Sequence, residues 1–290
     1  MHYVKAKGIL SPTNGMNLYR GCSHGCIYCD SRSKCYHMEH AFEDIEVKEN
    51  AVGLLEAALK RKREKCMLAT GSMTDPYLPL EEELGMVRGA LALAKRYGFG
   101  FTLITKSARV LRDIDLLQAI NEDTKCVVQM TLTTADEALC KKLEPNVSTT
   151  SERVAALKTL HGAGIPTVVW LSPILPFLND TEENIRGLLD QCAEAGVYGV
   201  ICFGMGLTLR EGSREYFYRQ ADRLFPGLKE QYIRSYGMQY QLTSPDNDRL
   251  MALFHDFCEA RGIVHDNERI FAYLRAFEDK RRPEQISLFE

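Results

Sequence analysis

Three cysteines lie close together near the start of the chain, Cys22, Cys26 and Cys29, within the run GCSHGCIYCD. Thiolates are preferred ligands of soft metals and of iron–sulfur clusters. Three thiolates in one short loop can hold one metal ion or three irons of a cluster. A four-coordinate structural zinc site needs a fourth ligand, for which His24 and Cys35 are candidates. The spacing therefore predicts a metal centre, either a cluster with one open position or a closed zinc site.

The Cys-x3-Cys-x2-Cys spacing, with Tyr28 before the last cysteine, resembles the radical S-adenosylmethionine (SAM) superfamily. The resemblance implies that Cys22, Cys26 and Cys29 hold a [4Fe-4S] cluster whose fourth iron is open to SAM. It also implies that the reduced cluster breaks SAM to give a 5′-deoxyadenosyl radical. An electron donor such as flavodoxin or ferredoxin is implied as a partner, and Tyr28 is implied as a packing partner of the SAM adenine.

Other segments resemble the spore photoproduct lyase-like (DNA repair photolyase-like) branch of this superfamily. They are residues 71–77, 104–107, 111–117, 143–145, 163–166 and 173–180. Spore photoproduct lyases use a cysteine near the end of the second strand to return a hydrogen atom to the product radical. This chain has Gly71, Ser72 and Met73 there. The resemblance thus implies radical generation and puts the carbon–carbon lyase activity itself in doubt.

Six expected strands alternate with helices along the first two thirds of the chain. The expected strands are 16–20, 66–70, 101–105, 126–132, 166–171 and 197–203, and the expected helices are 51–62, 81–97, 111–120, 136–143, 151–161 and 181–194. Continuous apolar strands between amphipathic helices predict an α/β fold with a parallel sheet covered by helices. Six units without reversal favour an incomplete (β/α)6 barrel of the TIM type, in which chemistry lies at the C-terminal ends of the strands.

Polar residues follow several of these strands. Ser72 and Thr74 follow the second strand and Lys106 follows the third. By the resemblance, Ser72 and Thr74 are candidate contacts for the SAM amino group, and Lys106 is a candidate partner for its carboxylate. No catalytic residue is assigned. Further candidates at strand ends are Thr131, Thr133, Ser172 and Met205. For Thr131 and Met205, packing in the core is an equally good explanation.

The pattern changes after about residue 206, where helices are expected at 214–224, 228–236, 248–261 and 268–277 without a strong strand. We therefore expect a radical SAM partial barrel over 1–205, a helical extension over 206–279 and a flexible tail over 280–290. The run Tyr216 to Arg219 is either a stacking surface for a flipped base or core of the extension.

The end of the tail, QISLF from Gln285 to Phe289, resembles the bacterial sliding-clamp-binding motif. Two large apolar side chains, Leu288 and Phe289, are suited to fill a pocket on a partner, and Gln285 is suited to orient them. The resemblance implies the sliding clamp as a partner. The alternative is a tail that folds back and buries both apolar residues.

Composition limits the classes of protein that fit. The 290 residues carry 36 Lys plus Arg and 39 Asp plus Glu, a net charge of -3. This excludes a strongly basic nucleic-acid coat but not a local basic channel. No apolar run approaches the ~20 residues of a membrane span, and the first residues lack the apolar core of a signal peptide. We therefore expect a cytoplasmic protein without a membrane partner. Of its 10 cysteines, the clustered ones are expected to serve metal binding or catalysis rather than disulfides.

These observations predict a radical SAM enzyme that acts on nucleic acid, in lesion repair or modification. Two alternatives remain open from the sequence. One is a radical SAM enzyme that acts on a peptide or a small metabolite. The other is a non-catalytic zinc-binding interaction module.

Overall fold

The computed structural model describes residues 1–281 of the chain. Its centre is a six-stranded sheet in which every neighbouring pair of strands is parallel. In spatial order the strands are β2 (Gly15–Met16), β5 (Met67–Thr70), β6 (Gly100–Thr105), β7 (Cys126–Thr131), β8 (Thr167–Trp170) and β9 (Gly199–Ile201). The edge strands β2 and β9 are not neighbours in this sheet, so the barrel is open. The predicted incomplete (β/α)6 barrel is confirmed.

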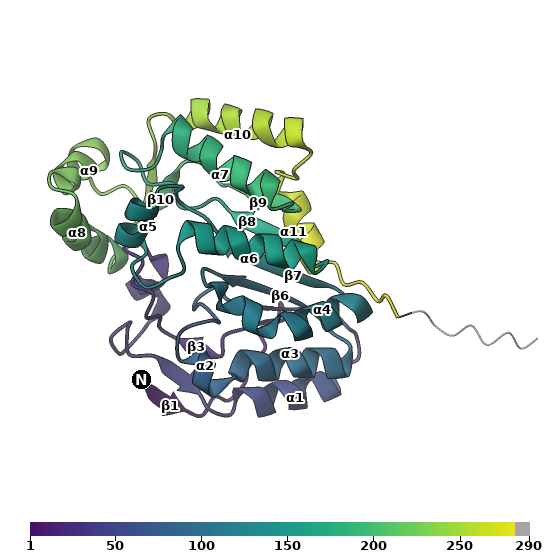
Figure 1. Cartoon of the computed structure of the whole chain (residues 1–290). Coiled ribbons are helices and arrows are strands. Elements are labelled where there is room, and N and C mark those ends of the chain that lie inside the picture. The colour runs from purple at the N-terminus through teal and green to yellow at the C-terminus, as the bar shows by residue number, and fades with distance from the viewer. Residues whose placement is uncertain (282–290) are drawn as a thin grey trace, which may run out of the picture.

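Helices between the strands cover the outer face of the sheet (Figure 1). They are α1 (Ala51–Arg61), α2 (Glu81–Leu84), α3 (Met86–Tyr97), α4 (Ile114–Asp123), α5 (Glu137–Leu143), α6 (Thr150–Gly162) and α7 (Glu182–Glu194). The predicted helix 81–97 is two helices, because Gly85 interrupts it with a left-handed φ of 60°. A short 3-10 helix, η3 (Ala108–Asp113), precedes α4. The apolar faces of these helices and of the strands form the largest core of the protein.

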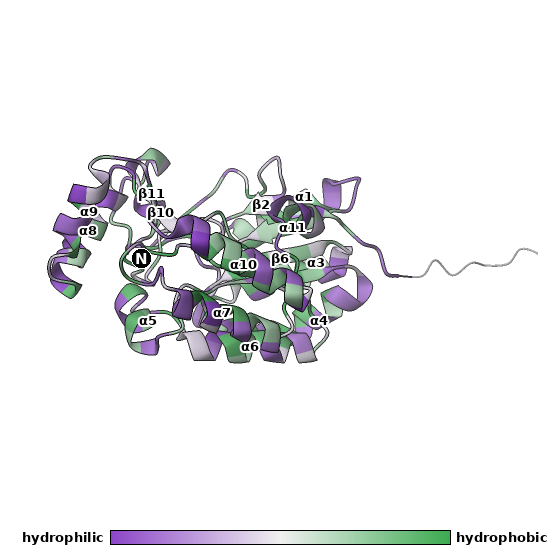
Figure 2. Ribbon diagram, turned by 90° about the horizontal axis from the view of Figure 1, so that it is seen from above, coloured by the Kyte–Doolittle hydropathy of each residue, from purple (hydrophilic) through white to green (hydrophobic). Residues whose placement is uncertain are grey.

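The last helix described, α11 (Asn267–Arg275), lies on the opposite, inner face of the sheet. In Figure 2, α11 lies on one side of β6 while α6 and α7 lie on the other. Its Ile270 and Leu274 pack against Val127, Val168 and Ile201 of the strands. The backbone of α11 also accepts a hydrogen bond at 2.8 Å from a lysine that precedes β7. The helix therefore runs along the inner face from the C-terminal end of β9, where Asn267 Nδ2 donates to the Cys202 carbonyl at 2.8 Å, to the N-terminal end of β7.

A second, small sheet carries the chain into the cysteine loop. It has the order β1-β4-β3, with β1 (His2–Val4), β4 (Glu46–Lys48) and β3 (Tyr19–Arg20). The single strand predicted at 16–20 is wrong, because the chain leaves the barrel after Met16 and joins this second sheet at Tyr19. Two 3-10 turns, η1 (Asp30–Arg32) and η2 (Lys34–Tyr36), follow the cysteines.

The region after residue 206 contains a lobe beside the barrel and one long helix on it. The lobe is formed by α8 (Ser213–Leu224), α9 (Leu228–Tyr236) and an antiparallel pair, β10 (Gly206–Thr208) with β11 (Gln241–Thr243). No strong strand is expected here from the sequence, and this pair, with three residues per strand, is too short to give a sequence pattern. The long helix α10 (Asn247–Arg261) packs on α7.

The aromatic run of the extension, Tyr216 to Arg219, packs mainly within the protein. Phe217 is fully buried, and its ring lies 5.2 Å from that of Tyr232 in the lobe. The same apolar cluster includes Ile27 and Tyr28 of the cysteine loop. Tyr216 is covered by the guanidinium of Arg32, 3.7 Å from its ring centre. The run therefore joins the lobe to the cysteine loop instead of forming a free stacking surface.

Two further sequence features concern the tail and the membrane. The tail residues Gln285, Leu288 and Phe289 lie outside the described residues. Within residues 1–281, no helix has the length and apolar character needed to cross a membrane.

Candidate active site

Two adjoining cavities lie at the C-terminal ends of the barrel strands. The smaller, of about 140 Å³, is lined by the three cysteines of the loop, and we call it the cluster cavity. The larger, of about 840 Å³, extends from there to the surface, and we call it the mouth cavity. Ser72, Lys106 and Tyr28 line both cavities, and Thr74 lines the cluster cavity. The structure thus brings together all of the predicted cofactor-binding residues.

The cysteine sulfurs are spread around the cluster cavity. Among residues 1–281, the only group with three ligand atoms within 4.8 Å of one another is His2, His40 and Asp44, elsewhere in the protein. At least one pair of sulfurs of the cysteine loop is therefore more than 4.8 Å apart. Thiolates on one tetrahedral zinc ion would be only about 3.8 Å apart, given Zn–S bonds of about 2.3 Å. The spacing fits a cluster between the sulfurs better than a single ion.

The two candidate fourth ligands for zinc do not complete such a site. His24 is buried in the cluster cavity, but its Nδ1 faces the Asp75 carboxylate at 3.5 Å. Its Nε2 is buried without a hydrogen-bond partner in the described part of the chain. Cys35 is exposed, with its sulfur 3.3 Å from Arg210 Nη1, and does not line the cavity. An open set of three thiolates beside an unpaired imidazole nitrogen fits a [4Fe-4S] cluster with its fourth iron free for SAM.

Backbone hydrogen bonds fix the cysteine loop on both sides. The N–H of Cys22 donates to the carbonyl of Phe42 at 2.9 Å, and that of Ile27 donates to the carbonyl of Leu143 at 2.9 Å. Gly21 precedes the first cysteine with a φ of 86°, and a Cβ there would lie 2.5 Å from the Phe42 carbonyl oxygen. Only glycine permits this close approach. The loop is therefore positioned by contacts with the rest of the protein.

A buried charged network holds Tyr28. Its hydroxyl donates to the carboxylate of Glu144, which also pairs with Arg153. Arg153 donates further to the carbonyl of Thr131 at 2.7 Å and to the sulfur of Cys140 at 3.1 Å. Burial alone would raise the pKa of Glu144, but the cations of Arg153 and Lys106 hold it below its usual value. The ring of Tyr28 is therefore fixed as a wall between the two cavities.

The sequence did not reveal this network. From the sequence, the segment around Glu144 is expected to form turns and helix ends only, because it contains a proline and is followed by glycines. Its carboxylate meets a tyrosine 116 positions away in the sequence. No local spacing can indicate such a contact, and Glu144 has lysines two and three residues before it, so its burial has no sequence signal either.

Lys106 supplies a cation at the boundary between the cavities. Its Nζ lies 5.9 Å from the ring centre of Tyr28. Burial alone would lower the pKa of Lys106, but the neighbouring Cys26 and Glu144 raise it above its usual value. The residues described place no carboxylate within 4.0 Å of its Nζ. The ammonium is thus a charged group available to an anionic ligand.

Asp75 ties the ends of two strands together beneath this lysine. Its carboxylate accepts hydrogen bonds from Thr105 Oγ1 and the Lys106 N–H, both at 2.7 Å, and from the Tyr77 N–H at 2.9 Å. The backbones that carry Ser72 and Lys106 are therefore held at a fixed separation. Their side chains stay free to face the cavities.

Aromatic side chains form one wall of the mouth cavity. Trp170 and Phe203 line it, and their ring centres are 6.1 Å apart. Phe203 is 61% exposed, and Phe271 of α11 supports both rings at 5.8 and 6.1 Å. The indole N–H of Trp170 donates to Gln129 at 2.8 Å and fixes the ring. Sequence reasoning missed this wall, because its rings come from β8, from the loop after β9 and from α11.

The remaining strand-end candidates divide between the cavities and the core. Ser172 and Met205 line the mouth cavity, and Thr131 lines both cavities. Thr133 lines neither, and its carbonyl accepts hydrogen bonds from two buried asparagines. The mouth cavity lining includes one cysteine, Cys29, which is a predicted cluster ligand.

Comparisons with known proteins show the family of the chain. The sequence matches the family model of the radical SAM superfamily over residues 16–192. An uncharacterised protein of Mycobacterium tuberculosis is 31% identical over 229 residues, 76% of this chain and 66% of that protein. An uncharacterised protein of Methanocaldococcus jannaschii is 33% identical over 191 residues, 63% of this chain and 70% of that protein. The chain thus spans about two thirds of the length of the mycobacterial relative (66%).

Solved structures of spore photoproduct lyase have the same fold. A complex of that enzyme with a dinucleoside spore photoproduct matches with a TM-score of 0.63 and 15% identity, over 89% of this chain and 78% of the other. A point mutant of it matches with a TM-score of 0.65 and 14% identity, over 91% and 80%. With the family model covering residues 16–192 of 290, the chain belongs to the radical SAM superfamily, whose cofactors are a [4Fe-4S] cluster and SAM.

Proposed function

We propose that this chain directs a 5′-deoxyadenosyl radical at a base of a nucleic acid, in repair or modification. One observation carries the proposal. The mouth cavity opens beside the cluster cavity and presents an aromatic wall, the partly buried Trp170 and the exposed Phe203, to an entering ligand. Nucleobases stack on aromatic side chains, and each such contact contributes about 1–3 kcal/mol.

Each part of the cofactors has residues suited to it. Cys22, Cys26 and Cys29 hold the cluster, and Lys106 pairs with the SAM carboxylate. The amino group of SAM is received by Ser72 and Thr74. When bound, the reduced cluster supplies one electron to SAM, whose S–C5′ bond breaks to give methionine and a radical that takes a hydrogen atom from the substrate.

The protein contributes position and charge to this chemistry. The hydroxyl of Tyr28 is held by Glu144, so its ring is a rigid surface against which adenine can pack. Lys106 remains protonated, because Cys26 and Glu144 raise its pKa above the usual value. A fixed cation and a fixed ring orient a bound ligand at little entropic cost.

The size and charge of the molecule favour a base over a long duplex as the object of recognition. A cavity of about 840 Å³ lies within the range of small-molecule sites, which suits one or two bases taken out of a stack. The net charge of -3 gives no general attraction to DNA. The spore photoproduct lyase structure that shares this fold holds a dinucleoside lesion, which supports the same class of substrate.

The test is 5′-deoxyadenosine production by the anaerobically reconstituted, dithionite-reduced protein. Three reactions are compared, with no DNA, with undamaged DNA and with ultraviolet-irradiated DNA, and Cys26→Ala serves as the cluster-free control. A yield that rises with nucleic acid supports the proposal, and a rise with irradiated DNA alone identifies lesion repair. An equal, slow yield in all three would contradict it and favour a peptide or metabolite substrate.

The tail offers an independent link to nucleic acid. The QISLF sequence that ends at Phe289 resembles a sliding-clamp-binding peptide, and such binding would bring the enzyme to replicating DNA. A peptide of residues 280–290 is expected to bind the bacterial clamp, and Phe289→Ala is expected to abolish binding. No binding by the unmodified peptide at high concentration would remove this part of the proposal.

A further inference from the structure

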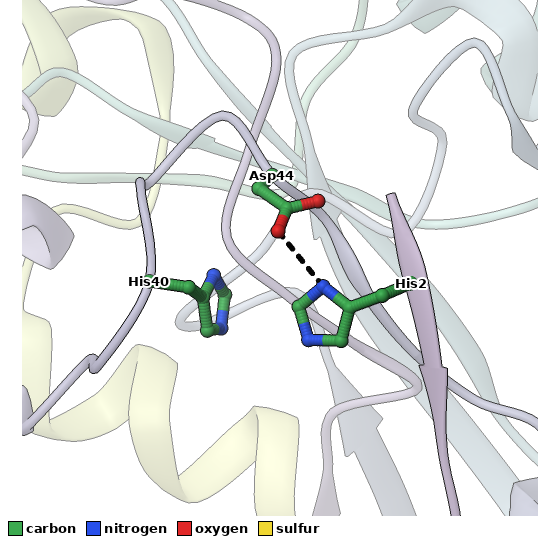
Figure 3. Close-up of side chains that lie close together, drawn as sticks. All are labelled: His2, His40 and Asp44. Carbon is green, nitrogen blue, oxygen red and sulfur yellow. Dashed lines mark hydrogen bonds and ion pairs between the residues drawn. The ribbon is translucent and has the colours of Figure 1, made fainter.

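A second group of metal-ligand side chains lies away from both cavities. One nitrogen of His2, one nitrogen of His40 and one carboxylate oxygen of Asp44 lie within 4.8 Å of one another. The Nδ1 of His2 is 2.9 Å from Asp44 Oδ2, and the two imidazole rings meet edge to face with centres 4.8 Å apart. Figure 3 shows His2 coming from β1 and the other two from the segment that precedes β4. All three side chains are partly buried.

The hydrogen bonding of His40 leaves one nitrogen free for a metal. Its Nδ1 lies 3.0 Å from the carbonyl oxygen of Ala41, and only a protonated nitrogen can donate to that acceptor. In the neutral imidazole, the lone pair is then on Nε2. Within the described residues, Nε2 is buried and has no hydrogen-bond partner. A backbone carbonyl that fixes the tautomer while the other nitrogen stays unpaired is typical of a metal-binding histidine.

A further carboxylate lies within reach of this nitrogen. The Oε2 of Glu46 is 3.7 Å from His40 Nε2, and Glu46 is the direct register partner of His2 in the β1–β4 pair. Two neutral imidazoles and two carboxylates would balance the charge of a divalent cation. The N-terminal ammonium of Met1 forms an ion pair with Asp44 Oδ1 at 3.0 Å, so without a metal Asp44 is held by this ion pair and by His2.

We propose that His2, His40 and Asp44 bind one divalent zinc ion, with Glu46 completing the coordination. Zinc prefers imidazole and carboxylate ligands in a tetrahedral arrangement with bonds of about 2.0–2.2 Å, which places ligand atoms about 3.3 Å apart. The separations of 2.9 and 3.7 Å between the paired ligand atoms lie on either side of that value. Small side-chain shifts are sufficient to admit the ion.

The position of this site indicates a structural role. Phe42 lies between His40 and Asp44 in the chain, and its carbonyl accepts the hydrogen bond from the Cys22 N–H at 2.9 Å. An ion bound to His40 and Asp44 would tie this segment to β1. The ion would thereby stabilise the segment that holds the backbone of Cys22, the first cysteine of the loop.

The test uses the full chain with its N-terminus untagged and its cluster reconstituted anaerobically, so that the cysteines are occupied and do not take up zinc. After a chelator wash, Zn²⁺ is titrated and bound zinc is measured per chain. One zinc per chain with a dissociation constant below about 1 µM is expected, and His40→Gln should weaken it at least ~tenfold. His37→Asn is the matched control, because His37 is exposed in the same segment and asparagine tolerates its left-handed φ of 51°.

Zinc X-ray absorption provides a second readout that does not depend on a variant folding. The proposal predicts only nitrogen and oxygen neighbours, at about 2.0–2.2 Å. No zinc uptake by the cluster-loaded protein, unchanged affinity in His40→Gln, or sulfur neighbours at about 2.3 Å would each overturn it. These readouts report neither SAM cleavage nor substrate, so they stand apart from the test of the proposed function.

Discussion

The cluster cavity and the mouth cavity share a boundary but are built in opposite ways. Around the cluster cavity, backbone hydrogen bonds fix Cys22 and Ile27, and a buried ion pair fixes Tyr28. Around the mouth cavity, Phe203 is 61% exposed, and the facing wall is a strand pair three residues long. The part that serves radical generation is thus fixed by burial, while the part that meets the substrate is left accessible. Substitutions in the two parts should therefore fail in different ways.

Cys26→Ala should cause the most severe loss. Two thiolates cannot hold the cluster that three hold, so iron and sulfide should fall from about four each per chain to near zero. All SAM cleavage should disappear with them. Cys35→Ala is the matched control, since Cys35 is exposed outside the cavity lining, and it should keep both. Cleavage retained by Cys26→Ala would show that the ligand assignment is wrong.

Glu144→Gln should be the most destabilising change near the cluster cavity. It leaves Arg153 as a buried cation without its carboxylate, and breaking such a pair costs about 3–5 kcal/mol. Urea unfolding of the cluster-free protein measures this loss. The exposed Glu183→Gln on α7 is the control and should change stability by less than ~0.5 kcal/mol. Equal stability of the two variants would mean that the network does not fix Tyr28.

The same carboxylate predicts a pH dependence of stability. The pKa of Glu144 is held below its usual value in the folded protein. Its contribution is therefore present above the unfolded pKa of about 4.3 and is lost as pH falls through the folded pKa. Unfolding free energies measured between about pH 6 and pH 3 should decline more steeply in the wild type than in Glu144→Gln. Parallel curves would contradict the assignment.

Lys106→Met should weaken SAM binding without unfolding the protein. A hydrogen bond to a charged group contributes about 1.5–3 kcal/mol, so the dissociation constant for SAM should rise roughly 10- to 150-fold. Equilibrium dialysis of cluster-loaded protein measures this directly. Unaltered SAM affinity would place the SAM carboxylate elsewhere and leave Lys106 as a neighbour of the thiolates only.

Phe203→Ala tests the accessible mouth cavity and should have the smallest effect on the protein itself. Because the ring is exposed, unfolding should change by less than ~1 kcal/mol. Binding of the nucleic acid should weaken roughly 5- to 150-fold, the value of one stacked base. Met238→Ala, at an 82% exposed side chain outside the cavity lining, is the control. If both variants have the same dissociation constant for the nucleic acid, the aromatic wall is not where the substrate binds.

The strands and helices of the barrel were predictable because their patterns are local. Runs such as Met67–Thr70 and Gly100–Thr105 are continuously apolar or small, and the helices between them are amphipathic. The small sheet was not predictable, because β3 and β4 are two and three residues long and pair across the chain. The pair β10–β11 was not predicted either, because its strands are equally short.

The candidate site divides in the same manner. Ser72 and Lys106 follow barrel strands, and a parallel barrel gathers the residues that follow its strands at one end of the sheet. The cysteines were identified by their own spacing, although a strand of the small sheet lies between them and the first barrel strand. Glu144 and Phe203 were missed, because their partners are distant in sequence and meet only through tertiary packing. Sequence spacing thus revealed the cofactor end of the site and gave little information on the substrate end.

The origin of the hydrogen atom in 5′-deoxyadenosine tests a nucleic-acid substrate most directly. The reduced, cluster-loaded protein is incubated with SAM and perdeuterated DNA, irradiated or not, and the product is analysed by mass spectrometry. We expect deuterium in 5′-deoxyadenosine, with less in Phe203→Ala. Product that contains only protium and forms at the same rate without DNA would contradict a nucleic-acid substrate.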